Sequence, residues 1–346
     1  MTFETVDNIL TISTDTVMTT AMAGILLLIG FWIKKKVKIL DKYCIPAPVV
    51  GGFLFMFITW AGYSTNTFTF NFTNTFQDPF MLAFFTTVGL GASFSLLKKG
   101  GVLLIIYWLT AGIISIFQNI IGIAVGTAIG LPAPYALLSS AISMIGGHGA
   151  ALSYGSTFVK MGYDQGQLVG AAAATFGLVS GSLMGGPTAR SIINRYGLTS
   201  TESEAEIMEI DDENAEEKAK AERVDTDAFT NAAILLIVAS GVGTVLTALL
   251  NNIHFGQFKL TFPTYIGAML VAAVIRNFCD AKHIVLPAKA IDLWGNVSLS
   301  IFLAIALMTL KLWQLASLAG PMIVMLAAQV VLMFVFARFV VFNIMG

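Results

Sequence analysis

One stretch decides the fold: Ser139-Ser140-Ala141-Ile142-Ser143-Met144-Ile145-Gly146-Gly147-His148-Gly149-Ala150-Ala151-Leu152-Ser153-Tyr154. It lies among strongly apolar segments, yet its middle consists of three glycines around one histidine. Glycine is a poor helix former and exposes its backbone, so this composition disfavours a continuous helix in contact with lipid. Irregular backbone at membrane depth is tolerated only where protein or a water-filled cavity covers it. The stretch therefore predicts a re-entrant hairpin over residues 135–155, in which two half-helices meet at a glycine-rich tip.

The composition of the whole chain is typical of an integral membrane protein. Of its 346 residues, 56% are hydrophobic and only 11% are charged, and the mean hydropathy is +0.82. A water-soluble globule is far less apolar, so we expect an all-α, polytopic membrane fold. The net charge of -1 comes without a basic stripe, which predicts that no nucleic acid is bound. Two cysteines, Cys44 and Cys279, provide neither a disulfide framework nor a four-ligand transition-metal site.

Hydrophobic segments and charged loops predict the path through the membrane. Besides the hairpin we expect nine full spans, at about residues 17–33, 45–62, 80–97, 102–129, 168–186, 228–250, 262–275, 297–310 and 321–344. Five lysines between residues 34 and 42 place the first loop in the cytoplasm by the positive-inside rule. The amino terminus is then outside, and the hairpin begins and ends outside because Arg190 and Arg195 follow the next span.

The composition changes completely between residues 199 and 227. This segment holds twelve acidic residues against Lys218, Lys220 and Arg223. A charge run of this kind is typical of a solvated connector, so we expect a cytoplasmic linker, with a regulatory or partner-binding tail as the alternative. The linker divides the chain into a first transmembrane repeat (residues 1–198) and a second repeat (residues 228–346).

Faint internal similarity supports the division into two repeats. Pro46 matches Pro263, and Phe84 matches Ile301, each at an offset of 217 (263 - 46 = 217; 301 - 84 = 217). The order of spans repeats as well, and five spans per repeat is an odd number, so we expect the second copy to have inverted topology. Adding 217 to Gly146 gives 363, which lies beyond Gly346, so the second copy is expected to be incomplete at its carboxyl end.

Six co-linear motifs resemble those of the bacterial glutamate:sodium symporter family. They are Asp41–Gly52, Asp78–Phe85, Gln118–Gly122, Gly146–Gly149, Ala174–Val179 and Gly295–Ser300. The resemblance implies a multi-pass protein of the bacterial inner membrane that imports L-glutamate with Na⁺ as the coupling ion, by alternating access. It also implies two inverted repeats, a second hairpin and closing helix that this sequence does not contain, no cofactor, and a homodimer.

The residues near the hairpin allow a hypothesis for the transport site. Arginine is nearly absent from the predicted spans, so we expect the positive end of a half-helix to receive the carboxylates of an anionic amino acid. The predicted substrate-binding residues are Asn119, Ser143, Gly146, Gly147, His148 and Gly149. Na⁺ prefers hard oxygen ligands, and the predicted ion ligands are the hydroxyls of Thr86, Ser143, Ser153 and Thr175.

Each candidate has a simpler structural explanation. The three glycines could form a packing notch within an ordinary helix, and His148 could bond to a neighbouring helix. Asn119, beside Gln118, could join helices, since amides commonly do so in lipid. The hydroxyl of Thr175 could bond back to its own helix.

The alternatives to a coupled carrier are a passive channel, a carrier for another small organic anion and a truncated fragment that does not transport. A membrane enzyme with His148 as its base is a further class, but the sequence has no Ser/His/Asp, HExxH or phosphate-loop pattern. It has no selectivity-filter motif either. The inverted repeat and the hairpin therefore favour a carrier and not an enzyme.

Overall fold

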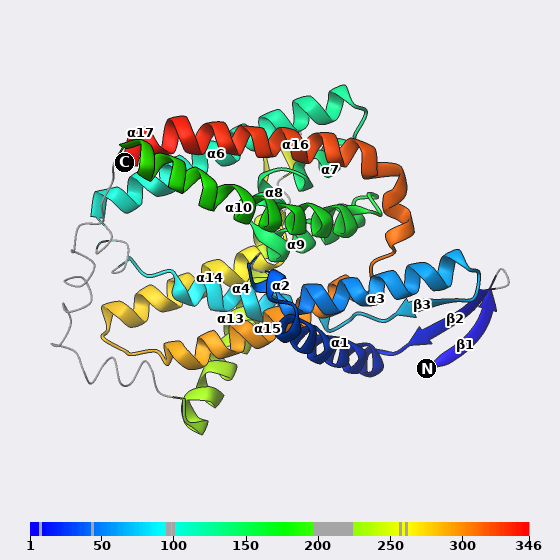
Figure 1. Ribbon diagram of the computed structural model, residues 1–346. Helices are drawn as coiled ribbons and strands as arrows, with labels where there is room; N and C mark the ends of the chain where they lie inside the picture. The colour runs from blue at the N-terminus through cyan, green and yellow to red at the C-terminus, as the bar shows by residue number, and fades with distance from the viewer. Residues whose placement is uncertain are drawn as a thin grey trace. The chain divides into compact units, whose positions relative to one another are not determined.

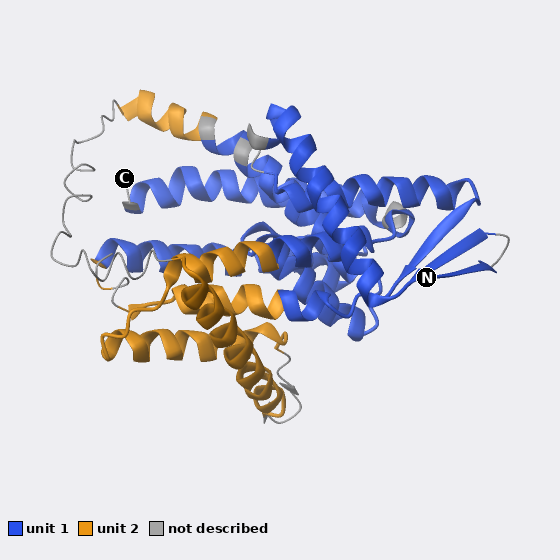
Figure 2. Ribbon diagram, turned by 90° about the horizontal axis from the view of Figure 1, so that it is seen from below, with its two compact units in different colours: residues 1–80, 102–185, 299–346 blue, residues 81–101, 186–298 orange. Residues whose placement is uncertain are grey.

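The computed structural model describes residues 1–6, 9–42, 45–94, 98, 101–196, 224–255, 258–259 and 262–345. The chain is mostly helical and forms two compact units (Figures 1 and 2). Unit 1 comprises residues 1–80, 102–185 and 299–346, and unit 2 comprises residues 81–101 and 186–298. The units are defined by packing and the predicted repeats by sequence order, so the repeat boundaries near residues 198 and 228 stay predictions. The predicted linker lies outside the described residues as far as residue 223.

Seven helices of the described chain are long and apolar enough to cross a membrane. They are α1 (Thr16–Lys36), α3 (Ala47–Ser64), α6 (Gly101–Ala128), α10 (Gly166–Tyr196), α13 (Thr226–Asn251), α15 (Ala288–Met308) and the run Ala319–Ile344, which begins with α16 (Ala319–Phe336). Only 17% of the most apolar window of α6 is buried, which is expected of a helix that faces lipid. The protein is therefore a polytopic membrane protein.

Two of the nine predicted spans form helices that are shorter than expected. Helix α4 (Gln77–Gly91) has 15 residues and α14 (Tyr265–Ala281) has 17, whereas an upright span needs about 20. Helix α4 stops at Gly91, within the span predicted near residues 80–97, and residues 95–97 at the end of that span lie outside the described residues. The span predicted near residues 297–310 starts earlier, at Ala288, directly after Pro287, a residue that is suited to a helix start.

The prediction of an all-α fold was wrong at the amino terminus. Strand β1 (Thr2–Val6) pairs antiparallel with β2 (Ile9–Thr14), and β2 pairs in parallel with β3 (Phe68–Phe72). A second small sheet joins β4 (His254–Phe255) to β5 (Phe258–Lys259). The strands of the first sheet are rich in Thr, Ile and Phe, whose branched and aromatic side chains suit a pleated surface.

In unit 1, α1 and α3 approach each other closely at two glycines. A Cβ atom on Gly30 would lie 2.1 Å from the carbonyl oxygen of Ala47, and one on Gly51 would lie 2.1 Å from that of Leu26. Only glycine permits this backbone contact, as in other closely packed membrane helices. The later part of α15 completes the group through a cluster formed by Ala23, Leu26, Phe55, Ala304, Ile305 and Met308.

A second group in unit 1 surrounds the predicted hairpin. It includes α6, α7 (Ala133–Leu138), α10 and α16, together with α8 (Ala141–Met144) and α9 (Gly147–Lys160). Its buried apolar cluster consists of Leu131, Tyr135, Ala136, Leu138, Val169, Ala173, Met322, Met325 and Leu326. The hairpin is thus packed against α10 and α16.

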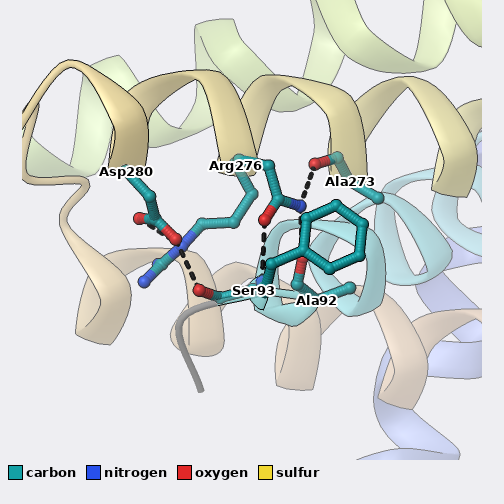
Figure 3. A network of polar contacts seen from close by, with 7 residues as sticks. Ala92, Ser93, Ala273, Arg276 and Asp280 are labelled. Atoms are coloured by element: carbon teal, nitrogen blue, oxygen red, sulfur yellow. Dashed lines mark hydrogen bonds and ion pairs between the residues drawn. The ribbon is translucent and has the colours of Figure 1, made fainter. Parts of the chain in front are cut away.

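Unit 2 packs the later part of α4 with α13, α14 and the first part of α15. Its core is Leu90, Ala232, Leu236, Ala272, Ala290 and Ile291. A polar network fixes the end of α4, as Figure 3 shows. The Ser93 hydroxyl donates to Asp280 Oδ2 at 2.5 Å, and Arg276 pairs with the other carboxylate oxygen at 3.0 Å. The side chain of Asn277 donates to the carbonyl oxygen of Ala92 and accepts the N–H of Phe94, so the backbone groups freed by the helix end are satisfied.

The bounds of the helices repeat at the offset found in the sequence. Helix α3 spans residues 47–64, and adding 217 gives 264–281, compared with 265–281 for α14. Helix α4 ends at residue 91, and 91 + 217 = 308, the last residue of α15. Helix α6 begins at residue 101, and 101 + 217 = 318, one residue before α16 begins. These three bounds therefore support the predicted repeat.

Candidate functional site

The stretch that decides the fold is a broken helical hairpin in unit 1. Helix α7 begins after Pro132, α8 follows a break at Ser139 and Ser140, and α9 runs back from the glycine tip. Both α7 and α8 contact α9. Gly147 has φ +64°, a left-handed conformation that glycine adopts without strain. The predicted break at the glycines is confirmed. The prediction of two half-helices was wrong, because the first arm is itself divided into α7 and α8.

The interruption at Ser140 has a local cause. The Ser140 hydroxyl donates to the carbonyl oxygen of Ala136 at 2.7 Å, a back-bond that competes with regular helix. The same hydroxyl accepts the side-chain N–H of Gln329 on α16 at 3.0 Å. The break is therefore held by a neighbouring helix, which explains why the hairpin sequence does not reveal it.

The tip of the hairpin presents backbone donors. The backbone N–H groups of Gly147, His148 and Gly149 lie in the first turn of α9. These are the first amides of α9, which have no partner within a helix. A Cβ atom on Gly146 would lie 2.5 Å from both the Ala150 Cβ and the Ile142 carbonyl oxygen, so this position requires glycine. The tip thus combines free donors with a tightly defined turn.

His148 is buried and bonded to the neighbouring helix α10. It is 6% exposed, and its Nε2 lies 2.9 Å from the Thr175 hydroxyl. That hydroxyl also lies 2.9 Å from the carbonyl oxygen of Ala171. Because the hydroxyl has one proton, which it gives to Ala171, its lone pair accepts the Nε2 proton of His148. The network assigns the Nε2–H tautomer and leaves Nδ1 as an acceptor.

Two buried glutamines that the sequence analysis did not select lie beside the hairpin. Gln118 on α6 and Gln329 on α16 are both 0% exposed, and Gln329 Nε2 donates to the Gln118 carbonyl oxygen at 2.9 Å. The side-chain Oε1 and Nε2 of Gln118, and the Oε1 of Gln329, have no partner among the described residues. Asn119, which was predicted, is only partly buried, and its Oδ1 also has no partner there. A lone amide in an apolar span was the available signal for Gln329.

The predicted hydroxyl ligands fall into two groups. Ser143 and Ser153 are almost fully buried, and their hydroxyls have no hydrogen-bond partner within the described chain. Ser139 shares this property. Thr86 belongs to unit 2, where its hydroxyl contacts the carbonyl oxygen of Leu82 at 2.7 Å and the Ser240 hydroxyl at 2.9 Å. The structure therefore brings Ser143 and Ser153 together with the hairpin, and Thr86 into a different unit.

Comparison with known proteins places this arrangement in a family. A sequence model for the sodium/glutamate symporter matches residues 12–346. The chain belongs to the sodium/glutamate symporter family. It is 34% identical over 334 residues to the sodium/glutamate symporter of Haemophilus influenzae and 35% identical over 335 residues to that of Escherichia coli K12. Each alignment covers 96% of this chain and 81% of the relative.

Membership of the sodium/glutamate symporter family confirms the resemblance in the motifs and the prediction of a membrane carrier. The family is one of transporters, so the prediction that the chain is not an enzyme is confirmed as well. Within the described residues, no group of three or more His, Cys, Asp or Glu side chains could hold a metal ion. The unpartnered groups of this site are amides, hydroxyls and backbone N–H groups, which suit reversible binding of a solute and a hard cation.

Proposed function

We propose that the chain is a secondary transporter that carries L-glutamate into the cell together with Na⁺. Membership of the sodium/glutamate symporter family supports this assignment. The observation that carries it is the hairpin tip, where Gly147, His148 and Gly149 begin α9 and their backbone amides have no partner within that helix. A helix amino terminus with free amides and a positive dipole end is a ready site for a carboxylate.

Glutamate fits the tip by charge and by donor count. The amides of α9 receive one carboxylate, which needs no arginine. Among the described residues of the carboxyl-terminal helices in unit 1, one arginine is present. It is Arg338, in the π-helical turn Ala337–Val341 and not in the hairpin. His148 Nδ1, left as an acceptor by the bond to Thr175, accepts a hydrogen bond from the substrate ammonium group. His148 thus binds the amino group of the substrate, while the backbone amides of α9 bind its carboxylate.

Na⁺ is proposed to bind to hard oxygens next to the hairpin. The hydroxyls of Ser143 and Ser153 are buried and unpartnered among the described residues, as are the Oε1 atoms of Gln118 and Gln329. Burying such groups without partners costs about 1–3 kcal/mol each, a cost that a bound cation removes. Thr175 and Thr86 are weaker candidates, because each already donates to a carbonyl oxygen.

We further propose that the two repeats are inverted and that the hairpin is re-entrant. The equivalent helix bounds at an offset of 217 support the repeat, and the lysines between residues 34 and 42 support an outside amino terminus. Alternating access then follows from movement of one group of helices against the other. The homodimer that the resemblance implies stays a prediction, which chemical cross-linking in the membrane can test.

Uptake of radiolabelled L-glutamate into proteoliposomes tests the function. An imposed inward Na⁺ gradient should drive accumulation, and Ser143→Ala or Ser153→Ala should raise the Na⁺ concentration for half-maximal uptake by about tenfold. Ser115→Ala is the matched control, because the Ser115 hydroxyl on α6 already donates to the carbonyl oxygen of Ala111. Uptake that ignores Na⁺ would remove the coupling, and an ion current without a gradient-driven uptake would indicate a channel.

A further inference from the structure

We propose a second amino-acid site, a peripheral capture site that binds the zwitterionic substrate before it reaches the hairpin tip. It is a cavity of about 290 Å³ in unit 1, formed where α9 gives way to α10 and where α15 ends. Its polar lining consists of Asp164, Gln167, Thr309, Lys311 and Gln314. Small-molecule pockets span roughly 300–1,000 Å³, so this cavity admits a solute of amino-acid size. The proposal rests on the proposed function for the identity of the substrate.

The charges of the cavity match an α-amino acid. Asp164 and Lys311 line the same space, yet neither forms an ion pair within the described chain. Two opposite charges that share a cavity without touching leave room for a ligand that carries both signs. The ammonium group of the ligand bonds to Asp164, and its α-carboxylate bonds to Lys311, as charge-assisted hydrogen bonds.

The remaining polar groups fit the second carboxylate of glutamate. Gln167 and Gln314 are partly buried side chains whose amides donate hydrogen bonds. The backbone N–H groups of Gln167 and Leu168, in the first turn of α10, have no acceptor among the described residues. The site therefore offers donors at a distance from Lys311, while Val159 and Leu310 supply an apolar wall for the methylene groups.

The capture site is separate from the hairpin tip. Leu168 lines the cavity and Thr175 bonds to His148, and seven residues of α10 separate them, a rise of about 10 Å. Both charged side chains are exposed, so their bonds to a ligand are weak and the dissociation constant should be on the order of 1 mM. Weak binding at the periphery raises the local substrate concentration without retaining the substrate.

Protection of an engineered thiol tests the capture site. Gln314→Cys is introduced after Cys44 and Cys279 are replaced by alanine, and the purified protein is held in nanodiscs with K⁺ in place of Na⁺. We expect 10 mM L-glutamate to slow modification by a charged methanethiosulfonate reagent about tenfold, as approximately 1 mM affinity requires. Met161→Cys, exposed near the cavity but outside its lining, is the control and should be modified at an unchanged rate.

Ligands and charge variants identify what the cavity recognises. Glutarate, which lacks the ammonium group, should give little protection, and Asp164→Asn or Lys311→Gln should abolish the protection by glutamate. In uptake assays the same two variants should raise KM by about two- to fivefold with kcat unchanged. Both residues are exposed, so the variants should fold, and size-exclusion chromatography checks this.

Three outcomes would overturn the capture site. Equal protection by glutarate would show that only anions are recognised, and protection that survives both charge variants would place the effect elsewhere. Protection that requires Na⁺ would report on the transport site at the hairpin. Uptake by the unmodified chain is measured separately, so protection without Na⁺-driven uptake would reject the proposed function alone, and uptake without protection would reject the capture site alone.

Discussion

At the scale of single residues, the bond between His148 and Thr175 decides what the histidine can do. The sequence is compatible with a bond from His148 to a neighbouring helix and with a role of His148 in the site. The structure shows that bond, and the back-bond of Thr175 to Ala171 directs the free Nδ1 to another partner. The bond to Thr175 leaves Nδ1 as an acceptor, as the proposed contact with a substrate ammonium group requires, so the two explanations of His148 are compatible.

Replacing Thr175 should separate these contributions. Thr175→Val keeps the shape but leaves the buried Nε2–H of His148 without an acceptor, which should cost about 1–3 kcal/mol of stability. Thr175→Ser keeps the hydroxyl and should behave nearly as the original. Thermal unfolding in detergent measures the loss, and uptake measures the effect on KM for glutamate. Equal stability of the two variants would mean that the imidazole finds another partner and that its tautomer is not fixed by Thr175.

Gln329 is a residue whose structural role could not be predicted from the sequence. The glycines around His148 stood out because glycine is unfavourable in an apolar helix. Gln329 is a single amide in α16, and only its contacts with Gln118 and Ser140, 211 and 189 residues away, show that it supports the hairpin. Such contacts depend on tertiary packing, which leaves no periodic trace in one sequence.

At the scale of elements, the turn into α9 depends on the backbone conformation of Gly147. Its φ of +64° is strained for any residue with a Cβ atom, although nothing lies within 4 Å of the position that a Cβ would occupy. Gly147→Ala should therefore destabilise the protein by about 1–2 kcal/mol through the backbone alone and weaken glutamate binding.

Gly181→Ala on α10 is the matched control for that prediction. Gly181 also has open space around it and lies inside a helix without a positive φ. There alanine should stabilise by about 0.5–1 kcal/mol, because it is the better helix former. Thermal unfolding of both variants should thus move in opposite directions. A shift of the same sign would show that the left-handed turn is not needed.

The polar contacts that hold the end of α4, drawn in Figure 3, lead to a prediction about stability. Asn277→Ala removes the partners of the Ala92 carbonyl and the Phe94 N–H, which should cost about 1–3 kcal/mol. Asp292→Asn, an exposed change on α15, should stay within about 0.5 kcal/mol. Chemical denaturation in mild detergent compares the two. Similar losses would indicate that water satisfies the backbone groups after α4.

The sequence predicted the long helices correctly, because the length of an apolar segment determines them. It did not predict the strands, because these depend on pairing between distant segments. Helices α6 and α13 and the helical run Ala319–Ile344 lie close to their predicted ranges, because burying backbone polar groups in lipid requires helices. Strand β2 pairs with β3 across residues 10–14 and 68–72, and that pairing is set by contacts distant in sequence. Thr, Ile and Phe favour strands, but composition alone does not show which segments pair.

At the scale of the whole molecule, equivalent contacts recur in the two repeats. Gly30 packs against the Ala47 carbonyl, and the Thr247 hydroxyl lies 2.9 Å from the Thr264 carbonyl oxygen (30 + 217 = 247; 47 + 217 = 264). The same pair of helix faces thus meets in α1 with α3 and in α13 with α14. Two unrelated bundles would have no reason to share this register.

The repeats also exchange one helix. A Cβ atom on Gly52 of α3 would touch Leu307 of α15, and one on Gly89 of α4 would touch Met269 of α14 (52 + 217 = 269; 89 + 217 = 306). Unit 2 begins on α4 at Met81 and ends on α15 at Ser298, and 81 + 217 = 298. Each predicted repeat therefore contributes the corresponding helix to both units.

The inverted topology of the two repeats stays a prediction, which can be measured at two equivalent positions. Thr65 caps the end of α3 and Lys282 caps the end of α14, both are exposed, and 65 + 217 = 282. With Cys44 and Cys279 replaced, Thr65→Cys should react with a membrane-impermeant reagent added outside intact cells. Lys282→Cys should react only after the cells are permeabilised, because an odd number of spans separates the two ends. If both thiols react from the same side, the two repeats have the same orientation and the proposed architecture of the transporter fails.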